Sequence, residues 1–227
     1  MPKVLHIGPC DSPGGMANVM HILAEHPPEG WEAELLASHV VGSPWAKWRA
    51  YRRARSTLIR MLNDPTQRPD VVHLHTAADW SWWRKRRFAL LAHASGCKVV
   101  VHIHSGKFDT WLGSVNSSKT KQMQTDLNST SAATVVLSDH WARTFSEHFE
   151  RLHVIGNPIS PTLQCSVDGR DTNHMLLLGR NDSVKGHDFA FKIARKVRKN
   201  GWELITTGTD HSEEGITGLG WVSEERK

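Results

Sequence analysis

Two cationic side chains stand at the two ends of a short loop that follows an apolar run. Arg180 comes directly after residues 174–179, and Lys185 precedes Gly186, where a helical pattern begins. In an open α/β sheet, loops at the carboxyl ends of parallel strands form ligand crevices, so both cations can converge on one diphosphate. Arginine supplies a planar fork of donors and lysine a mobile point charge. A solvated loop with two surface cations is the alternative that these residues leave open.

A second phosphate-handling feature lies near the amino terminus. The apolar run at residues 3–8 leads through residues 9–13 into Gly14 and Gly15, where another helical pattern begins. A helix N-terminus without bulky side chains offers free N–H groups to an anion, so we expect a phosphate there. The alternative is a plain strand-to-helix turn without a bound phosphate, which would need the same glycines.

Histidine is unusually frequent, with 15 residues in the chain. His73 and His75 form one His-X-His pair, and His102 and His104 form another. Because side chains alternate along a strand, both rings of a pair lie on one face, where a metal ion could fit between neighbouring strands. A metallohydrolase is therefore a minor alternative. No His-Glu-X-X-His motif or tight carboxylate group supports it, so we predict no metal site.

The elements that must position these residues alternate regularly. Short apolar runs and helical patterns follow one another, which predicts repeated β-α-β units and a parallel sheet. Strands are expected at residues 3–8, 32–40, 70–76, 98–104, 133–138 and 151–155, and helices at 15–25, 44–62, 80–94, 117–128 and 139–149.

The alternation breaks after residue 155, at Gly156-Asn157-Pro158 and a segment rich in Ser, Pro, Gly and Asp at residues 160–172. We therefore predict an N-terminal domain over residues 1–158 and a partial second domain over residues 159–227. In the second domain, strands are expected at residues 174–180, 202–208 and 219–222, and a basic helix at 186–200.

Composition narrows the class of protein. The chain has 227 residues, of which 39% are hydrophobic and 22% charged, so a globular protein is expected rather than a disordered or coiled-coil chain. The formal net charge of +5 favours an anionic partner. The three cysteines are too far apart for a disulfide framework or a thiolate zinc site. Without a visible signal peptide or membrane span, we expect a cytosolic protein that can still touch a membrane from outside.

Two segments combine tryptophan with arginine: residues 45–55, from Trp45 to Arg55, and residues 80–87, from Trp80 to Arg87. A helix of this kind can lie in a membrane interface, with aromatic rings at headgroup level and arginines on anionic lipid. An amphipathic helix whose apolar stripe belongs to the core is the open alternative. No base-reading motif is present, so nucleic acid is not expected as a partner.

Together these motifs resemble those of the retaining GT-B glycosyltransferases of the family 4 type. Such enzymes transfer a sugar from a nucleotide-sugar across a cleft between two Rossmann-like domains. The similar segments are the glycine pair of the first loop, residues 70–75, residues 154–158 and, most specifically, Gly179-Arg180 with Lys185-Gly186. The resemblance implies an α/β fold of GT-B type, a nucleotide-sugar donor, a lipid-linked or glycan acceptor, and no cofactor.

The resemblance also implies roles for individual residues. Arg180 and Lys185 match the residues that bind the donor diphosphate, where they stabilise the charge that develops on the leaving group. Gly14, Gly15 and Gly208 are expected beside the same diphosphate. His104 matches a histidine that lies beside the donor sugar, while a strand-end histidine satisfied by the backbone is the alternative. The residues identify no nucleophile or catalytic base, so retention of stereochemistry rests on the resemblance alone.

One element of the resembling enzymes has no counterpart. They carry a spaced pair of glutamates farther along the donor domain, whereas the pairs Glu213-Glu214 and Glu224-Glu225 are adjacent and lie too early. We expect these glutamates on the surface and the donor domain to be C-terminally incomplete, as a fragment or a truncated chain. A non-catalytic remnant that binds a nucleotide-sugar or an acceptor is therefore the alternative function.

Overall fold

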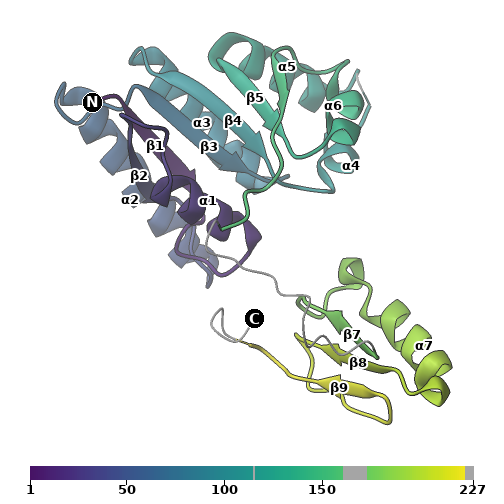
Figure 1. Cartoon of the computed structure of the whole chain (residues 1–227). Coiled ribbons are helices and arrows are strands. Elements are labelled where there is room, and N and C mark those ends of the chain that lie inside the picture. Colours follow the sequence, from purple (N-terminus) through teal and green to yellow (C-terminus); the bar gives the residue numbers. More distant parts are fainter. Residues whose placement is uncertain (115, 161–172, 223–227) are drawn as a thin grey trace. The chain divides into compact units, whose positions relative to one another are not determined.

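The chain forms two compact units, Met1–Leu163 and Gln164–Lys227. The computed structural model describes residues 1–114, 116–160 and 173–222, and Figure 1 shows the elements of each unit. The predicted linker at residues 160–172 lies outside the described residues, apart from its first one. Each unit is therefore considered by itself.

The first unit is built on a six-stranded parallel sheet with the strand order β2-β1-β3-β4-β5-β6. This order reverses between β1 and β3, which makes their carboxyl ends the topological switch point where open α/β sheets bind ligands. The sequence-based prediction of a Rossmann-like α/β fold is confirmed. The strands are β1 (Lys3–Gly8), β2 (Glu32–Ala37), β3 (Val71–Thr76), β4 (Lys98–Ile103), β5 (Ala133–Val136) and β6 (Leu152–Val154), and the helices are α1 (Gly15–Glu25), α2 (Pro44–Asn63), α3 (Trp80–Ala94), α4 (Phe108–Leu112), α5 (Ser118–Thr130) and α6 (Asp139–Phe145).

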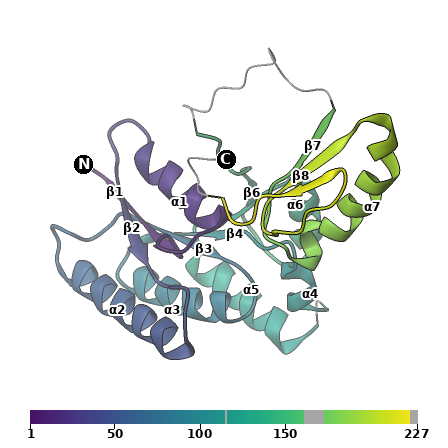
Figure 2. The same cartoon turned by 90° about the horizontal axis from the view of Figure 1, so that it is seen from below.

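The two faces of this sheet differ in chemistry because side chains alternate along each strand. Figure 2 shows α2, α3 and α5 on one side of the sheet and α1 on the other. The face toward α2, α3 and α5 is apolar and forms the main core with residues such as Leu58, Phe88 and Met123. The strand residues that contribute to this core are Leu5, Ile7, Val72, Leu74, Val99, Val101 and Ile103.

Most predicted elements of the first unit are present with shifted ends, and one helix was missed. Helix α4 has only five residues, of which Phe108 and Leu112 are buried. So short a helix shows no sequence periodicity, which explains why it was not predicted. The helix predicted at residues 139–149 ends at Phe145, and the strand predicted at 32–40 ends at Ala37.

The second unit is a small parallel sheet with the strand order β7-β8-β9 and one covering α-helix. The strand predicted at residues 219–222 was misplaced. The third strand lies earlier, because Ile216 is the residue that enters the core, at 1% exposure, whereas Leu219 is 38% exposed. The elements are β7 (His174–Leu177), η1 (Ser183–Lys185), α7 (His187–Val197), η2 (Arg198–Asn200), β8 (Glu203–Thr206) and β9 (Ile216–Gly218).

A buried lysine joins α3 to the carboxyl ends of β1 and β2. Lys85 is 1% exposed, and its Nζ donates a hydrogen bond to Ser38 Oγ at 2.7 Å. Ser38 Oγ in turn donates to the carbonyl oxygen of Gly8 at 3.2 Å. Burial, assisted by the nearby charge of Arg84, lowers the pKa of Lys85 from its usual 10.5 to about 7. Protonating Lys85 therefore opposes folding.

We predict that this lysine makes the stability of the first unit depend on pH. Between about pH 7 and 10.5 the unfolded chain binds more protons at Lys85 than the folded chain, so stability rises with pH across this window. The rise is on the order of a few kcal/mol, since one pKa unit corresponds to about 1.4 kcal/mol. Chemical denaturation of the wild type and of Lys85→Met at several pH values measures it.

Lys85→Met keeps the bond from Ser38 to Gly8 and should lose the pH dependence. Lys121→Met, at an exposed lysine of α5, is the matched control and should keep the wild-type slope. Equal slopes in all three proteins would contradict the prediction.

Candidate functional site

The two predicted cations lie on the loop between β7 and α7, at the carboxyl edge of the second unit's sheet. Lys185 ends η1, and its aliphatic stem packs beside Gly179, where an added Cβ would meet the lysine carbons at 3.5 Å. Arg180 and Lys185 are both exposed. Within the described part of the chain, neither is held by an ion pair or a side-chain hydrogen bond. Both charges are therefore available to an anion.

The end of β8 holds this loop in place through Thr207 and Gly208. The backbone N–H of Gly179 donates to Thr207 Oγ1 at 2.9 Å, and the same hydroxyl lies 3.2 Å from the carbonyl oxygen of Gly179. Gly208 has a φ of +81°, and a Cβ there would come within 2.3 Å of Gly179 O and 2.8 Å of Arg180 Cα. Only glycine allows this close approach. The structure thus places Gly208 against the backbone that carries Arg180.

The glycine turn of the first unit leads from β1 into α1 as predicted. Gly14 is the N-cap of α1, and no side chain caps the helix. The first turn holds no acidic residue, and a Cβ at Gly14 or Gly15 would meet only open space. Within residues 1–114, 116–160 and 173–222, no side chain caps the N–H groups that begin α1, which suits an anion.

His104 directly follows β4, at the same carboxyl edge as the glycine turn. Its backbone N–H donates to Thr76 O at 2.9 Å, and its ring Nε2 lies 3.0 Å from Nδ1 of His75. The His104 ring thus forms a hydrogen bond with another histidine side chain. The alternative interpretation expected backbone groups to satisfy this histidine. Burial lowers the pKa of His104 to about 4, so its imidazole is neutral at physiological pH.

The predicted site residues form two groups. Gly14, Gly15 and His104 belong to the first unit, whereas Arg180, Lys185 and Gly208 belong to the second. Within each unit the group lies at the carboxyl edge of a parallel sheet. Their convergence on one diphosphate stays a prediction.

Five histidines line the sheet face opposite the main core, and we call them the histidine wall: His6, His73, His75, His102 and His104. The strand register pairs His6 with His73 and His75 with His102. Burial lowers the pKa of His6 to about 4 and that of His102 to about 3, and it also lowers the pKa values of His73 and His75. The two predicted pairs do share one face. His6 was missed, although it stands at the matching position of the first strand.

The adjacent glutamates of the second unit take part in surface ion pairs. Glu213 pairs with Arg195 at 2.6 Å, and Glu214 pairs with Arg198 at 3.1 Å. Both therefore have partners within their own unit. The other adjacent pair, Glu224 and Glu225, lies outside the described residues.

The arginine-rich helix α2 divides its aromatic residues between core and surface. Tyr51 and Leu58 are buried in the core, as the amphipathic alternative expects. Trp45 and Trp48 are 63% and 46% exposed and stack on each other with ring centroids 4.6 Å apart. The Arg52 guanidinium lies 5.3 Å from the Trp48 ring centroid. Exposed aromatic rings and a cation thus share one surface.

A cavity of about 470 Å³ lies between α2 and α3 on this surface. It is lined by Trp48, Tyr51, Arg52, Arg55, Arg87, Leu90 and Leu91. The second segment that combines tryptophan with arginine, residues 80–87, is also divided between surface and core, since Trp80 is 76% exposed and Trp82 is 1% exposed. No described helix has both the length and the apolar character that crossing a bilayer requires.

Residues 4–158 match the family model of the glycosyl transferase 4-like domain. The matched range contains Gly14, Gly15 and the histidine wall, whereas the loop with Arg180 lies outside it. No curated protein matches the chain at a significant level.

We predict that Gly208→Ala destabilises the second unit more than Gly201→Ala. Both glycines have a positive φ, +81° and +78°, so both substitutions share the backbone strain. Only Gly208 also faces a clash, because the nearest atom to a Cβ at Gly201 is Asn173 Nδ2 at 4.0 Å. We expect the free energy of unfolding of the second unit to fall by about 1–3 kcal/mol more in Gly208→Ala than in Gly201→Ala, as at other overpacked sites. Hydrogen exchange of the β7 and β8 amides measures it, and equal losses in the two variants would contradict the close approach.

Proposed function

This chain belongs to the glycosyl transferase 4-like domain family, and we propose that it transfers a sugar from a nucleotide-sugar donor to an acceptor. The observation that carries the proposal is the exposed pair Arg180 and Lys185, on one loop at the carboxyl edge of a parallel sheet. Two free cations in this place suit a ligand with linked phosphates.

The proposed reaction requires these cations because the leaving nucleoside diphosphate gains negative charge as the glycosidic bond breaks. Opposite charges about 4 Å apart attract by roughly 4 kcal/mol at an effective dielectric constant near 20. The bonds from Thr207 and the close approach of Gly208 hold the loop before the donor arrives. Preorganised charges stabilise a transition state better than charges that must first be arranged. The uncapped start of α1 is proposed to add N–H donors to the same diphosphate.

His104 is proposed to contact the donor sugar. Its Nε2 is engaged with His75, which leaves Nδ1 for a sugar hydroxyl. A neutral imidazole nitrogen can accept or donate a hydrogen bond, so it orients the sugar without adding charge beside the reacting carbon. No residue is assigned as nucleophile or base, and retention of stereochemistry is proposed from the family resemblance.

The acceptor is proposed to be a lipid-linked sugar or a glycan, with the first unit placed against an anionic membrane surface. The cavity between α2 and α3 joins three arginines to Trp48 and two leucines. Arginines attract lipid phosphates, and exposed tryptophan rings settle at headgroup level.

A non-catalytic protein that binds a nucleotide-sugar or an acceptor is the second candidate. It is favoured by the ion pairs of Glu213 and Glu214 with Arg195 and Arg198, because these carboxylates are engaged within their own unit. Such a protein would bind nucleoside diphosphate without releasing it from nucleotide-sugars. A transfer assay with a panel of nucleotide-sugars and membrane lipid acceptors separates the two candidates.

We predict that Arg180→Ala and Lys185→Ala each weaken binding of nucleoside diphosphates about tenfold to hundredfold. This is the expected cost of losing one charge-assisted hydrogen bond. Calorimetric titration with UDP, GDP and ADP measures the change. Lys199→Ala is the control, because Lys199 is an exposed lysine of the same unit at η2, and it should bind as the wild type does. Equal affinities in all the proteins would remove Arg180 and Lys185 from the proposed site.

We also predict salt-sensitive binding of the protein to vesicles that contain phosphatidylserine. Arg52→Ala and Arg87→Ala should each weaken it about fivefold, since a basic residue near an anionic surface contributes about 1 kcal/mol. Co-sedimentation at low and high salt measures the effect. The control Arg60→Ala changes an exposed arginine of α2 that does not line the cavity. Indifference to phosphatidylserine would contradict the membrane proposal.

A further inference from the structure

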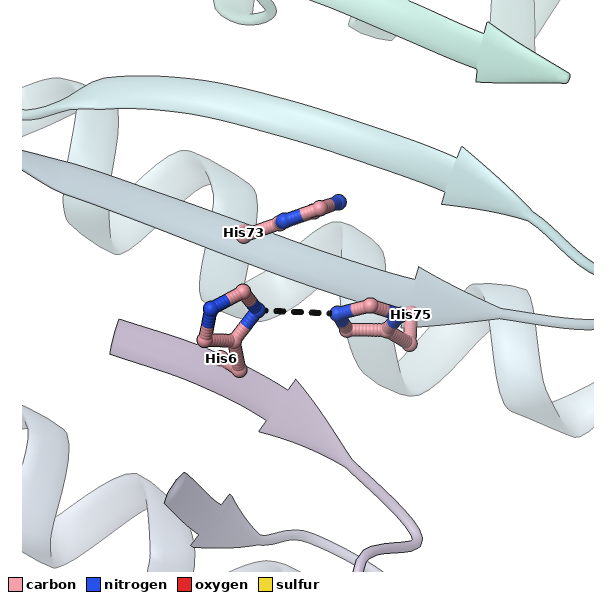
Figure 3. A group of neighbouring side chains, drawn as sticks. All are labelled: His6, His73 and His75. Atoms are coloured by element: carbon pink, nitrogen blue, oxygen red, sulfur yellow. Dashed lines mark hydrogen bonds between the residues drawn. The ribbon is translucent and has the colours of Figure 1, made fainter. Parts of the chain in front are cut away.

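The histidine wall brings three imidazoles together at the topological switch point of the first unit. His6 comes from β1, and His73 and His75 come from β3 (Figure 3). Each can offer one ring nitrogen, and these three nitrogens lie within 4.8 Å of one another. The ring centroid of His73 is 4.9 Å from that of His6 and 4.3 Å from that of His75. Three rings so close on adjacent parallel strands can turn toward one common point.

The hydrogen bonding of this wall is incomplete. His6 Nδ1 and His75 Nε2 lie 3.1 Å apart and share one hydrogen bond. His73 Nε2 is buried and has no hydrogen-bond partner among the described residues, and the same holds for both ring nitrogens of His102, a residue that is 2% exposed. Buried polar atoms normally find a partner, so such nitrogens need an explanation. For His73, a ligand that accepts electron pairs from several imidazoles at once would provide one.

The donor set identifies the chemistry of that ligand. Imidazole nitrogen is a preferred ligand of zinc and of other first-row transition metals, whereas magnesium and calcium prefer oxygen. Three protein ligands with one open position are a known arrangement for zinc. Ligand nitrogens of a tetrahedral site with bonds of about 2.0–2.1 Å lie roughly 3.4 Å apart. The pair His6 and His75 already has a comparable separation, so His73 is the ring that must move closer.

His75 also has the outer partner that a metal ligand usually has. Its Nδ1 lies 3.0 Å from Nε2 of His104. If His75 presents Nε2 to a metal, its Nδ1 carries the proton and donates a hydrogen bond to Nε2 of His104. This hydrogen bond orients the His75 ring. His6 then carries its own proton on Nε2, so both rings stay neutral. The hydrogen bond between His6 and His75 is replaced by two bonds to the metal.

We propose that His6, His73 and His75 form a binding site for a divalent transition metal ion of the zinc class. The fourth position is open to water or to an exogenous ligand. Neither Arg180 nor Lys185 takes part in this site, which contacts the proposed sugar-transfer residues only through the hydrogen bond between His75 and His104.

Calorimetric titration of the metal-free 227-residue chain with Zn²⁺ tests the proposal. We expect one tightly bound ion per chain. His6→Ala and His73→Ala should each weaken binding by more than about 100-fold, because losing even an outer partner of a ligand costs about 10–100-fold. His153→Ala is the matched control, since His153 is an exposed histidine on β6 and should leave the affinity unchanged.

A second measurement keeps the proposal testable if an alanine variant fails to fold. Visible absorption of the Co²⁺-loaded wild type should show the intense bands of a tetrahedral site, and His73→Gln, which retains a polar side chain, should lose them. Circular dichroism of each variant confirms its fold. The group His75, His102 and His104 shares His75 with the proposed site and is the alternative position for a metal ion. Loss of binding in His102→Ala with full binding in His6→Ala and His73→Ala would overturn the assignment, as would a wild type that binds no Zn²⁺.

Discussion

The alternation of side chains along β1, β3 and β4 is the constraint on which the first unit depends. One set of positions carries leucine, isoleucine and valine into the main core beneath α2, α3 and α5. The other set carries His6, His73, His75 and His102 on the opposite face. A shift of one residue in the register of any of these strands would exchange the two faces and bury imidazoles in the core. Stability and the chemistry of the histidine wall are thus determined by the same pairing of strands.

Burial determines which positive charges of this basic chain are available to a partner. The imidazoles of the wall are held neutral, and Lys85 lies near the point of losing its proton. Arg180 and Lys185 remain exposed on the loop that follows β7, and arginines of α2 and α3 line an open cavity. The proposed anionic donor and the proposed anionic membrane would therefore contact different residues. The buried nitrogens of His6, His73 and His75 are proposed to bind a metal ion, which needs neutral imidazoles.

Both groups of candidate site residues lie where parallel strands end, and this follows from the architecture. Right-handed β-α-β connections deliver every loop that follows a strand to the same edge of its sheet. The glycine turn after β1 and His104 after β4 therefore share an edge in the first unit, as the loops after β7 and β8 do in the second. In the second unit, Thr207 and Gly208 fix the backbone beside Arg180, so a glycine predicted to contact the donor also has a role in packing.

The amino-acid sequence alone was enough to predict the alternating order of elements, the parallel α/β fold and the edge positions of Gly14, Arg180 and Lys185, because periodicity and turn residues are local signals. It failed at β9 and at α4, where three to five residues are too few for a period to be read. Only the tertiary structure decided that His6 joins the other histidines, that Lys85 is buried and that α2 keeps Trp48 on the surface. The physical reason is that strand register and burial are set by partners distant in the chain, and no local pattern specifies which residues will meet.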